Sequence, residues 1–187
     1  MKFYKNIKLI ILIVFCCKTA IAQSYSSSEK EGINFYNQGL ELANQKLFDD
    51  SLISLSLSIE KFPNLMKAYF LKSRILGHLE QHEEAIKICN IALKKKDKQP
   101  IILSQKASSL YALKKYKESL EVSNLAVTHG KNLAYPYIAR ANANTSLGHY
   151  TQAINDYDTA LELVQNPSNS NLDETYLNRF CPLFKLK

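Results

Sequence analysis

The feature that most constrains this chain is an internal repeat with a period of 34 residues. When the sequence is shifted against itself by that period, a large apolar residue recurs at Phe35, Tyr69, Leu103 and Tyr137. Small residues recur in three further sets: Gly39, Ser73, Ala107 and Ala141; Ser51, Ala85, Ser119 and Ala153; Ser58, Ala92, Ala126 and Ala160. The register never slips, so four units tile residues 32–65, 66–99, 100–133 and 134–167.

Each unit carries the spacing of an amphipathic helix twice. In the fourth unit one stripe is Tyr137, Ala141, Asn144 and Leu147, and the second is Ala153, Ile154, Tyr157, Ala160 and Leu161. The short turn Gly148-His149-Tyr150 separates them, which predicts a helical hairpin. Small residues let two helices approach closely, and a hairpin with surplus apolar surface must stack on its neighbour. We therefore expect an all-α solenoid of four hairpins.

These residues resemble the tetratricopeptide repeat family, whose pattern runs aromatic, Leu-Gly, Tyr, Ala, aromatic, Ala and Pro. The fourth unit matches best, through Tyr137, Ala141, Ala153, Tyr157 and Ala160, and Pro63 matches the terminal proline in the first unit. The chain departs from the pattern where Gln38, Lys72, Lys106 and Arg140 replace the leucine and Asn144 replaces the tyrosine. The resemblance implies a right-handed superhelix whose first helices line a concave groove for extended peptides or helices.

The resemblance also implies which residues face that groove, because the second, fifth, ninth and twelfth places of each unit tend to lie on the concave side. The candidate partner-binding residues are Tyr36, Leu40, Lys67, Phe70, Arg74, Ser108, Tyr111 and Asn142. Further residues at these places are Ser104, Tyr135, Ile138 and Thr145. One subclass of the family grips the carboxylate terminus of cytosolic chaperones with Lys and Asn. Its places here hold Tyr36, Leu40, Leu71, Ile101 and Gln105, so no chaperone-tail clamp is expected.

The first 22 residues have the composition of a secretory signal peptide. Lysines at positions 2, 5 and 8 precede an unbroken apolar run over 9–17, and Ala20 and Ala22 supply the small residues that signal peptidase reads. We expect cleavage before Gln23 and a flexible, serine-rich leader over residues 23–31. One alternative is a retained membrane anchor, although the run is short for the ~30 Å of a bilayer core. Another is a lipid on Cys16 or Cys17, although bulky Phe15 precedes this pair.

Charge and cysteine content exclude several classes of function. The whole chain has a net charge of +7, and removing the four lysines of residues 1–22 leaves about +3, which is too weak a bias for nucleic acid. Two isolated cysteines then remain, Cys89 and Cys181, which do not suggest a disulfide framework. His78 and His82 are four residues apart, but His82 occupies the place of aromatic residues in the other units. We expect no catalytic, cofactor-binding or metal-binding residues.

The expected function is that of an exported scaffold, periplasmic or secreted in a bacterial envelope, that binds a protein or peptide partner in its groove. Contact with the membrane is expected only if the N-terminal segment is retained. One alternative is a subunit of an envelope assembly or secretion complex. Another is a small-ligand binder or enzyme, but the chain lacks a convergent set of titratable groups.

Two segments allow two interpretations each. Residues 168–187 include Asp173 to Arg179, which look like the opening of a fifth first helix that Pro182 would break. This segment either caps the last hairpin or belongs to a truncated array. The basic cluster Lys94 to Lys96, with Lys98, Lys114, Lys115 and Lys117, either complements the C-terminal end of a helix or binds an anionic partner.

Overall fold

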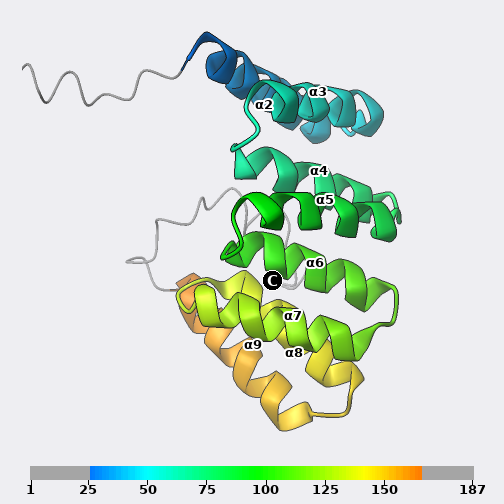
Figure 1. The fold of residues 1–187 in the computed structure, drawn as a ribbon. Helices are drawn as coiled ribbons and strands as arrows, with labels where there is room; N and C mark the ends of the chain where they lie inside the picture. The colour runs from blue at the N-terminus through cyan, green and yellow to red at the C-terminus, as the bar shows by residue number, and fades with distance from the viewer. Residues whose placement is uncertain (1–25, 166–187) are drawn as a thin grey trace, which may run out of the picture.

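The computed structural model describes residues 26–165, and these residues form eight helices and no strand. The four hairpins are α2 (Ser27–Asn44) with α3 (Phe48–Lys61), α4 (Met66–His78) with α5 (His82–Lys95), α6 (Pro100–Ala112) with α7 (Tyr116–His129), and α8 (Ala134–Ser146) with α9 (Tyr150–Gln165). They stack into a right-handed α-solenoid that runs from α2 to α9 (Figure 1). The fold class expected from the repeat is therefore confirmed. The predicted signal peptide and the segment 168–187 lie outside the described residues.

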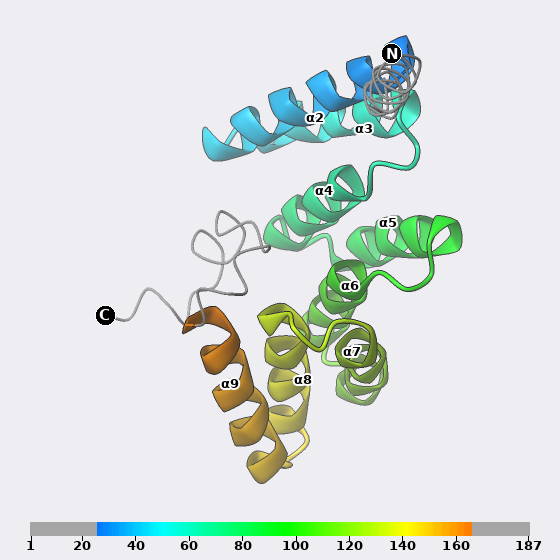
Figure 2. The same ribbon diagram turned by 90° about the vertical axis from the view of Figure 1, so that its left-hand side faces the viewer.

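In each of the first three hairpins, the second helix lies between two first helices. Thus α3 packs on α2 and α4, α5 on α4 and α6, and α7 on α6 and α8, whereas α9 packs mainly on α8. Figure 2 shows α4, α6 and α8 following one another, with α5 and α7 to one side of them. None of the described helices has the length and apolar character needed to span a bilayer.

The helix boundaries agree with the repeat units except at the N-terminus. The helices α4, α6 and α8 begin at the first residue of their units, but α2 begins at Ser27 instead of Gly32. Ser26 starts it early through a capping box: its Oγ accepts from the Glu29 N–H at 3.2 Å, and its N–H donates to Glu29 Oε2 at 2.8 Å. The prediction of a flexible leader is therefore wrong for residues 27–31.

The small residues of the repeat are all buried where hairpin helices meet, as predicted. Two of the serines among them make the same bond in different units. The Ser51 hydroxyl donates to the Gly39 carbonyl at 2.6 Å, and the Ser119 hydroxyl donates to the Ala107 carbonyl at 2.8 Å. A buried hydroxyl without a partner is costly, so these bonds explain how serine replaces alanine there.

The turn inside each hairpin has one conformation in all four units. Its central residue has a positive φ: 63° at Lys46, 59° at Glu80, 60° at Lys114 and 79° at Gly148. The residue that follows donates its N–H to a carbonyl five residues back, for example Lys115 to Leu110 at 3.0 Å. This is the Schellman ending of a helix, which favours glycine at the left-handed position. Three units place a long polar side chain there instead.

Long polar residues replace the leucine of the repeat pattern, and two of them reach the preceding unit. Lys72 Nζ donates to Ser56 Oγ at 2.8 Å, and one Arg140 nitrogen donates to Asn124 Oδ1 at 3.3 Å. Ser56 and Asn124 occupy the same place in their units. Burial lowers the pKa of Lys72, because the charged ammonium is partly removed from water.

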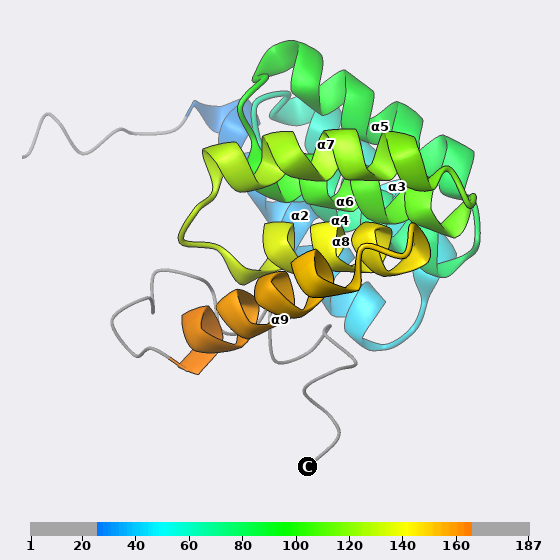
Figure 3. The ribbon, with the colours of Figure 1, turned by 90° about the horizontal axis from the view of Figure 1, so that it is seen from below.

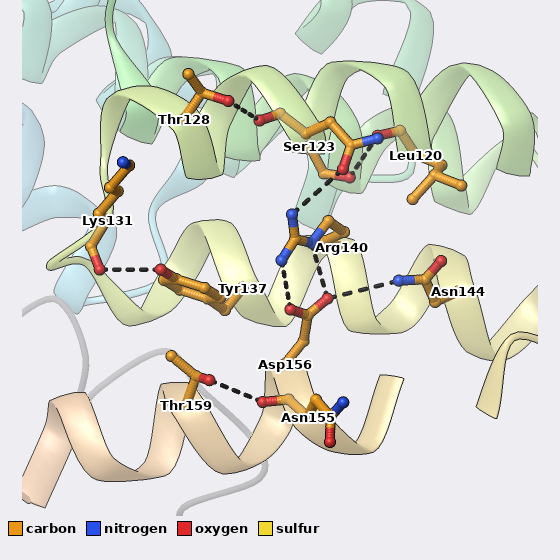
Figure 4. A network of polar contacts seen from close by, with 11 residues as sticks. Leu120, Ser123, Thr128, Lys131, Tyr137, Arg140, Asn144, Asn155, Asp156 and Thr159 are labelled. Atoms are coloured by element: carbon orange, nitrogen blue, oxygen red, sulfur yellow. Dashed lines mark hydrogen bonds and ion pairs between the residues drawn. The ribbon is translucent and has the colours of Figure 1, made fainter. Parts of the chain in front are cut away.

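A polar network joins α7, α8 and α9 (Figure 4). Arg140 binds the Asp156 carboxylate through two nitrogens, at 2.8 Å and 2.6 Å. Asn144 Nδ2 lies 3.5 Å from the same carboxylate, and the Arg140 guanidinium stands over the Tyr137 ring. The hydrogen bonds that Arg140 donates to the Asp156 carboxylate raise the pKa of Arg140. In the second unit the places of Asn144 and Asp156 hold Leu76 and Ile88, which belong to an apolar cluster.

The second apolar stripe of the fourth unit is only half buried. Ala153 and Ala160 are buried as predicted, but Ile154 and Leu161 are 58% and 43% exposed, and Tyr150 in the preceding turn is 65% exposed. The expectation that a neighbouring hairpin covers the apolar stripe therefore fails for Ile154 and Leu161 in the described part of the chain. The physical reason is that no following hairpin covers α9 there.

Candidate binding groove

A cavity of about 1010 Å³ opens on the side of the solenoid formed by the first helices. Residues from the C-terminal halves of α2 and α4, the middle of α6 and the start of α8 line it. Its apolar wall is Leu40, Phe48 and Ile75, and its polar residues include Arg74, Gln105, Ser108, Ser109 and Tyr135. A cavity of this size with a few converging polar groups is typical of a binding site. The first helices, which the resemblance expects to line a concave groove, supply most of the lining residues.

The polar floor of the cavity consists of Gln105, Ser108, Ser109 and Tyr135. Hydrogen bonds hold several of these side chains in place. The Tyr135 hydroxyl donates to Gln105 Oε1 at 2.9 Å and lies 3.2 Å from Ser108 Oγ, so α8 is tied to α6. Gln105 is buried at a place where the neighbouring units have Leu71 and Ala139. The Ser109 hydroxyl is also buried, and within residues 26–165 it has no hydrogen-bond partner. The floor therefore offers fixed hydrogen-bonding groups.

Aromatic and cationic side chains also contact one another in a row beside this floor. The Arg74 guanidinium carbon lies 5.5 Å from the centre of the Phe70 ring, within the range of a cation–π contact. The Phe70 ring meets Tyr135 edge to face at 6.3 Å, with an interplanar angle of 78°. These contacts fix Arg74 and Tyr135 relative to each other although they belong to different units. Such preorganised groups lose little entropy on binding.

The structure places the eight predicted partner-binding residues in three settings. Leu40, Arg74 and Ser108 line the cavity, and the Phe70 ring makes a cation–π contact with Arg74. Lys67 is exposed at the start of α4 and does not line the cavity. The remaining three residues make contacts within the array and do not line the cavity: Tyr36, Tyr111 and Asn142.

Those three residues have structural contacts that explain their positions. Tyr36 belongs to the apolar cluster between α2, α3 and α4. The Tyr111 ring lies 5.5 Å from that of Tyr116, beside the turn of the third hairpin. Asn142 Oδ1 accepts a hydrogen bond from the Tyr157 hydroxyl at 2.6 Å. A partner-binding role for them remains a prediction.

Sequence reasoning did not identify several residues of the cavity. Phe48 and His78 form an edge-to-face pair at 5.0 Å on one wall, and Ile75 lies on the same side. The family resemblance gives Gln105 only a place in the chaperone-tail clamp, not in the groove. A usable signal existed for Gln105, because it is a polar residue at a repeat place where the neighbouring units have Leu71 and Ala139.

Outside the cavity, the thiol and the paired carboxylates have structural roles that explain their positions. Burial raises the pKa of the Cys89 thiol to about 11, which makes it a poor nucleophile at neutral pH. Within residues 26–165 no group of three or more His, Cys, Asp and Glu residues is placed to hold a metal ion. Asp49, Asp50, Glu83 and Glu84 lie in the first turns of α3 and α5, where helix dipoles favour negative charge.

Comparison with known proteins agrees with this architecture. The tetratricopeptide repeat model matches residues 67–94 and 134–166, which fall in the second and fourth hairpins. These two hairpins are therefore similar in sequence to tetratricopeptide repeats. The first and third hairpins share their period, turn conformation and buried small residues. Proteins built from tetratricopeptide repeats are typically non-enzymatic scaffolds.

Solved tetratricopeptide structures have the same fold. The crystal structure of MamA has a TM-score of 0.60 at 14% identity, over 71% of this chain and 77% of that one. A MamA from Desulfovibrio magneticus RS-1 gives 0.60 at 15% identity, over 87% and 93%. The first TPR of Spaghetti (RPAP3), bound to the HSP90 peptide SRMEEVD, gives 0.59 at 13% identity, over 64% and 95%.

A curated relative is similar over part of the chain. Dynein axonemal assembly factor 4 of Rattus norvegicus is 32% identical over 79 residues, which cover 42% of this chain. The match spans only 19% of that relative, about a fifth of its length. The similarity therefore concerns a repeat segment.

Proposed function

We propose that this protein is an interaction scaffold outside the cytoplasm that binds an extended peptide or a helix of a partner protein in the groove between its first helices. The observation that carries the proposal is the floor of the cavity. There Arg74, Gln105, Ser108 and Tyr135 converge from three units, and contacts that need no ligand hold them in position.

The chemistry of the cavity suits a segment of polypeptide. Apolar side chains of the partner would pack on Leu40, Phe48 and Ile75. Backbone or side-chain polar groups would bond to Gln105 and Ser109, which lie beside that wall. A peptide complex of a tetratricopeptide neighbour with the same fold supports this choice of ligand class. Aromatic and Arg residues are also the usual energetic anchors of protein interfaces.

Export forms the second part of the proposal, and its support is the basic, apolar and small-residue succession of residues 1–22. N-terminal sequencing of the protein from fractionated bacterial cells tests it. The expected result is a mature chain beginning at Gln23 in the periplasmic or secreted fraction. A retained Met1 or a lipid on Cys17 would contradict cleavage there and indicate a membrane-attached form.

Site-specific photocrosslinking in intact cells tests the groove. A photoreactive amino acid replaces Glu41, which is exposed and lines the cavity, or Glu121, which is exposed on α7. Only the Glu41 derivative should form a discrete adduct with a partner protein. Equal adducts from both positions would contradict a groove-directed partner.

A pair of double variants then assigns the contact to the floor. Arg74→Ala with Tyr135→Phe removes the cation and the bridging hydroxyl but keeps both rings of the core. It should abolish the Glu41 adduct while the circular dichroism spectrum stays helical. The control is Lys94→Ala with Lys95→Ala on exposed positions of α5, which should change capture only slightly and mainly at low salt. Loss of the adduct in the lysine control alone would indicate a charge-driven contact.

A further inference from the structure

The outer faces of the second helices carry a row of apolar residues. One place of the repeat unit holds Leu57 in α3, Ile91 in α5 and Leu125 in α7, and Ile53 lies one turn earlier on α3. Ile53, Ile91 and Leu125 are 61%, 46% and 53% exposed. In Figure 3, which looks along the array, α5 is the outermost helix on this side. Contacts within residues 26–165 therefore do not explain why these three residues are apolar.

Exposed charges of opposite sign flank this row. Acidic residues predominate where the second helices begin, and they are Asp49 and Asp50 in α3, Glu83 and Glu84 in α5, and Glu118 in α7. Basic residues predominate at the other end, and they are Lys94, Lys95, Lys96 and Lys98, which outnumber Asp97, and Lys131 after α7. Two exposed residues reverse this pattern, Glu60 at the end of α3 and Lys117 at the start of α7. Helix dipoles favour acid at a start and base at an end, but they explain neither the reversals nor the apolar row.

We propose that two copies of this protein associate through these outer faces, with α5 of one copy packed antiparallel on α5 of the other. A two-fold axis through the middle of α5 brings Glu83 and Glu84 of each copy to Lys94 and Lys95 of the other. The same axis places Ile91 of each copy beside Lys87 of the other. Lys87 Nζ donates to Glu84 Oε2 at 2.8 Å within its own helix, so its alkyl stem is available to cover an apolar side chain.

The residues that reverse the charge pattern favour a second copy over an unrelated partner. A two-fold axis through α5 exchanges the flanking helices, so α3 of one copy lies beside α7 of the other. There Ile53 faces Leu125, and Glu60 at the end of α3 faces Lys117 at the start of α7. The two reversals therefore complement each other. A surface that is complementary to itself under a two-fold rotation is the requirement for a symmetric dimer.

The geometry of the array gives the two parts of this interface different roles. Because α5 is outermost, it forms the centre of the contact, and α3 and α7 form a charged rim (Figure 3). The first helices supply most of the cavity lining and lie on the other side of the array (Figure 2). Both cavities of the dimer therefore stay open, and the dimer does not depend on the function proposed for them.

Sedimentation equilibrium of the purified full chain over a range of concentrations tests the proposal. Glu83→Lys with Glu84→Lys makes both ends of α5 basic, and Lys94→Glu with Lys95→Glu makes both ends acidic. All four residues are exposed, so circular dichroism should show unchanged helicity. Each double variant alone should raise the dimer Kd by about tenfold or more, because like charges meet across the axis. An equimolar mixture of the two should form a mixed dimer, because their charges are complementary.

A pair of single variants separates the outer face of α5 from other exposed apolar sites. Ile91→Lys should also raise the dimer Kd, because it puts a charge beside the axis. Ile154→Lys is the matched control, since Ile154 is an exposed isoleucine on α9, and it should leave the dimer unchanged. The reverse result would assign self-association to the end of the array. A wild-type chain that stays monomeric at every concentration, or a wild-type dimer whose two charge variants stay monomeric when mixed, would overturn the proposal.

Discussion

The ion pair between Arg140 and Asp156 gives the sharpest test of how the fourth hairpin is held together. Asp156 is buried, with a side chain 7% exposed, and Arg140 is 25% exposed. Truncating Asp156 to alanine removes two charge-assisted hydrogen bonds and leaves a guanidinium partly out of water. Breaking a fully buried pair costs about 3–5 kcal/mol. Because water reaches part of Arg140, we expect a loss of about 2–3 kcal/mol in the free energy of unfolding.

A repeat-derived double variant separates the pair from its surroundings. The inner units have Ile88 and Val122 at the place of Asp156, and the repeat pattern has leucine at the place of Arg140. Arg140→Leu with Asp156→Val should therefore cost less than either single change, because neither charge is left alone. The expected coupling between the two positions is about 2 kcal/mol.

Urea denaturation followed by far-ultraviolet circular dichroism measures these differences, and hydrogen exchange localises them to α8 and α9. The pKa of Arg140 is raised, so its contribution is fully present below the ordinary guanidinium pKa and is lost only in strongly alkaline solution. Measurements near neutral pH therefore see the whole effect. A double variant whose loss equals the sum of the two single losses would refute the reasoning.

Three further predictions concern packing, turns and titration. Ala153→Leu should cost about 1–3 kcal/mol in urea denaturation, because Ala153 is buried between α8 and α9; unchanged stability would show that the helices do not meet there. Lys114→Gly should stabilise by about 0.5–1 kcal/mol, whereas Gly148→Ala should destabilise by a similar amount, because both positions have positive φ; the opposite signs would contradict the turn geometry. The Cys89 thiol should contribute stability below its ordinary pKa and lose that contribution as the pH rises toward about 11, so Cys89→Ala should show a weaker alkaline decline in thermal stability; identical declines would argue against burial as the cause.

Much of this architecture can be predicted from the periodicity alone. The period places the starts of α4, α6 and α8, and every small residue that it aligns is buried. These features depend on local spacing, which a sequence displays directly. The early start of α2 is harder to predict because its capping box, Ser26 with Glu29, lies in a serine-rich stretch that lacks apolar periodicity.

The groove was harder to predict, because it depends on how successive hairpins are rotated. Arg74 and Tyr135 are 61 residues apart in the sequence, and only the stacking of α4, α6 and α8 brings them to one cavity. Of the residues at the family places, Leu40, Arg74 and Ser108 line the cavity, whereas Tyr36 and Asn142 make contacts inside the array. The exposure of Ile154 also depends on whether another helix covers α9, which periodicity does not reveal.

The polar outer face of α2 gives the array a direction of growth. A unit inserted before α2 would have to bury Asn34, Asn37 and Glu41 against an apolar hairpin, at a desolvation cost for each group. A unit inserted between two inner hairpins would meet places that are already buried, and a unit inserted after α9 would meet the apolar residues Tyr150, Ile154 and Leu161. Duplication can therefore lengthen such a protein internally or toward its C-terminus, while its first hairpin stays first.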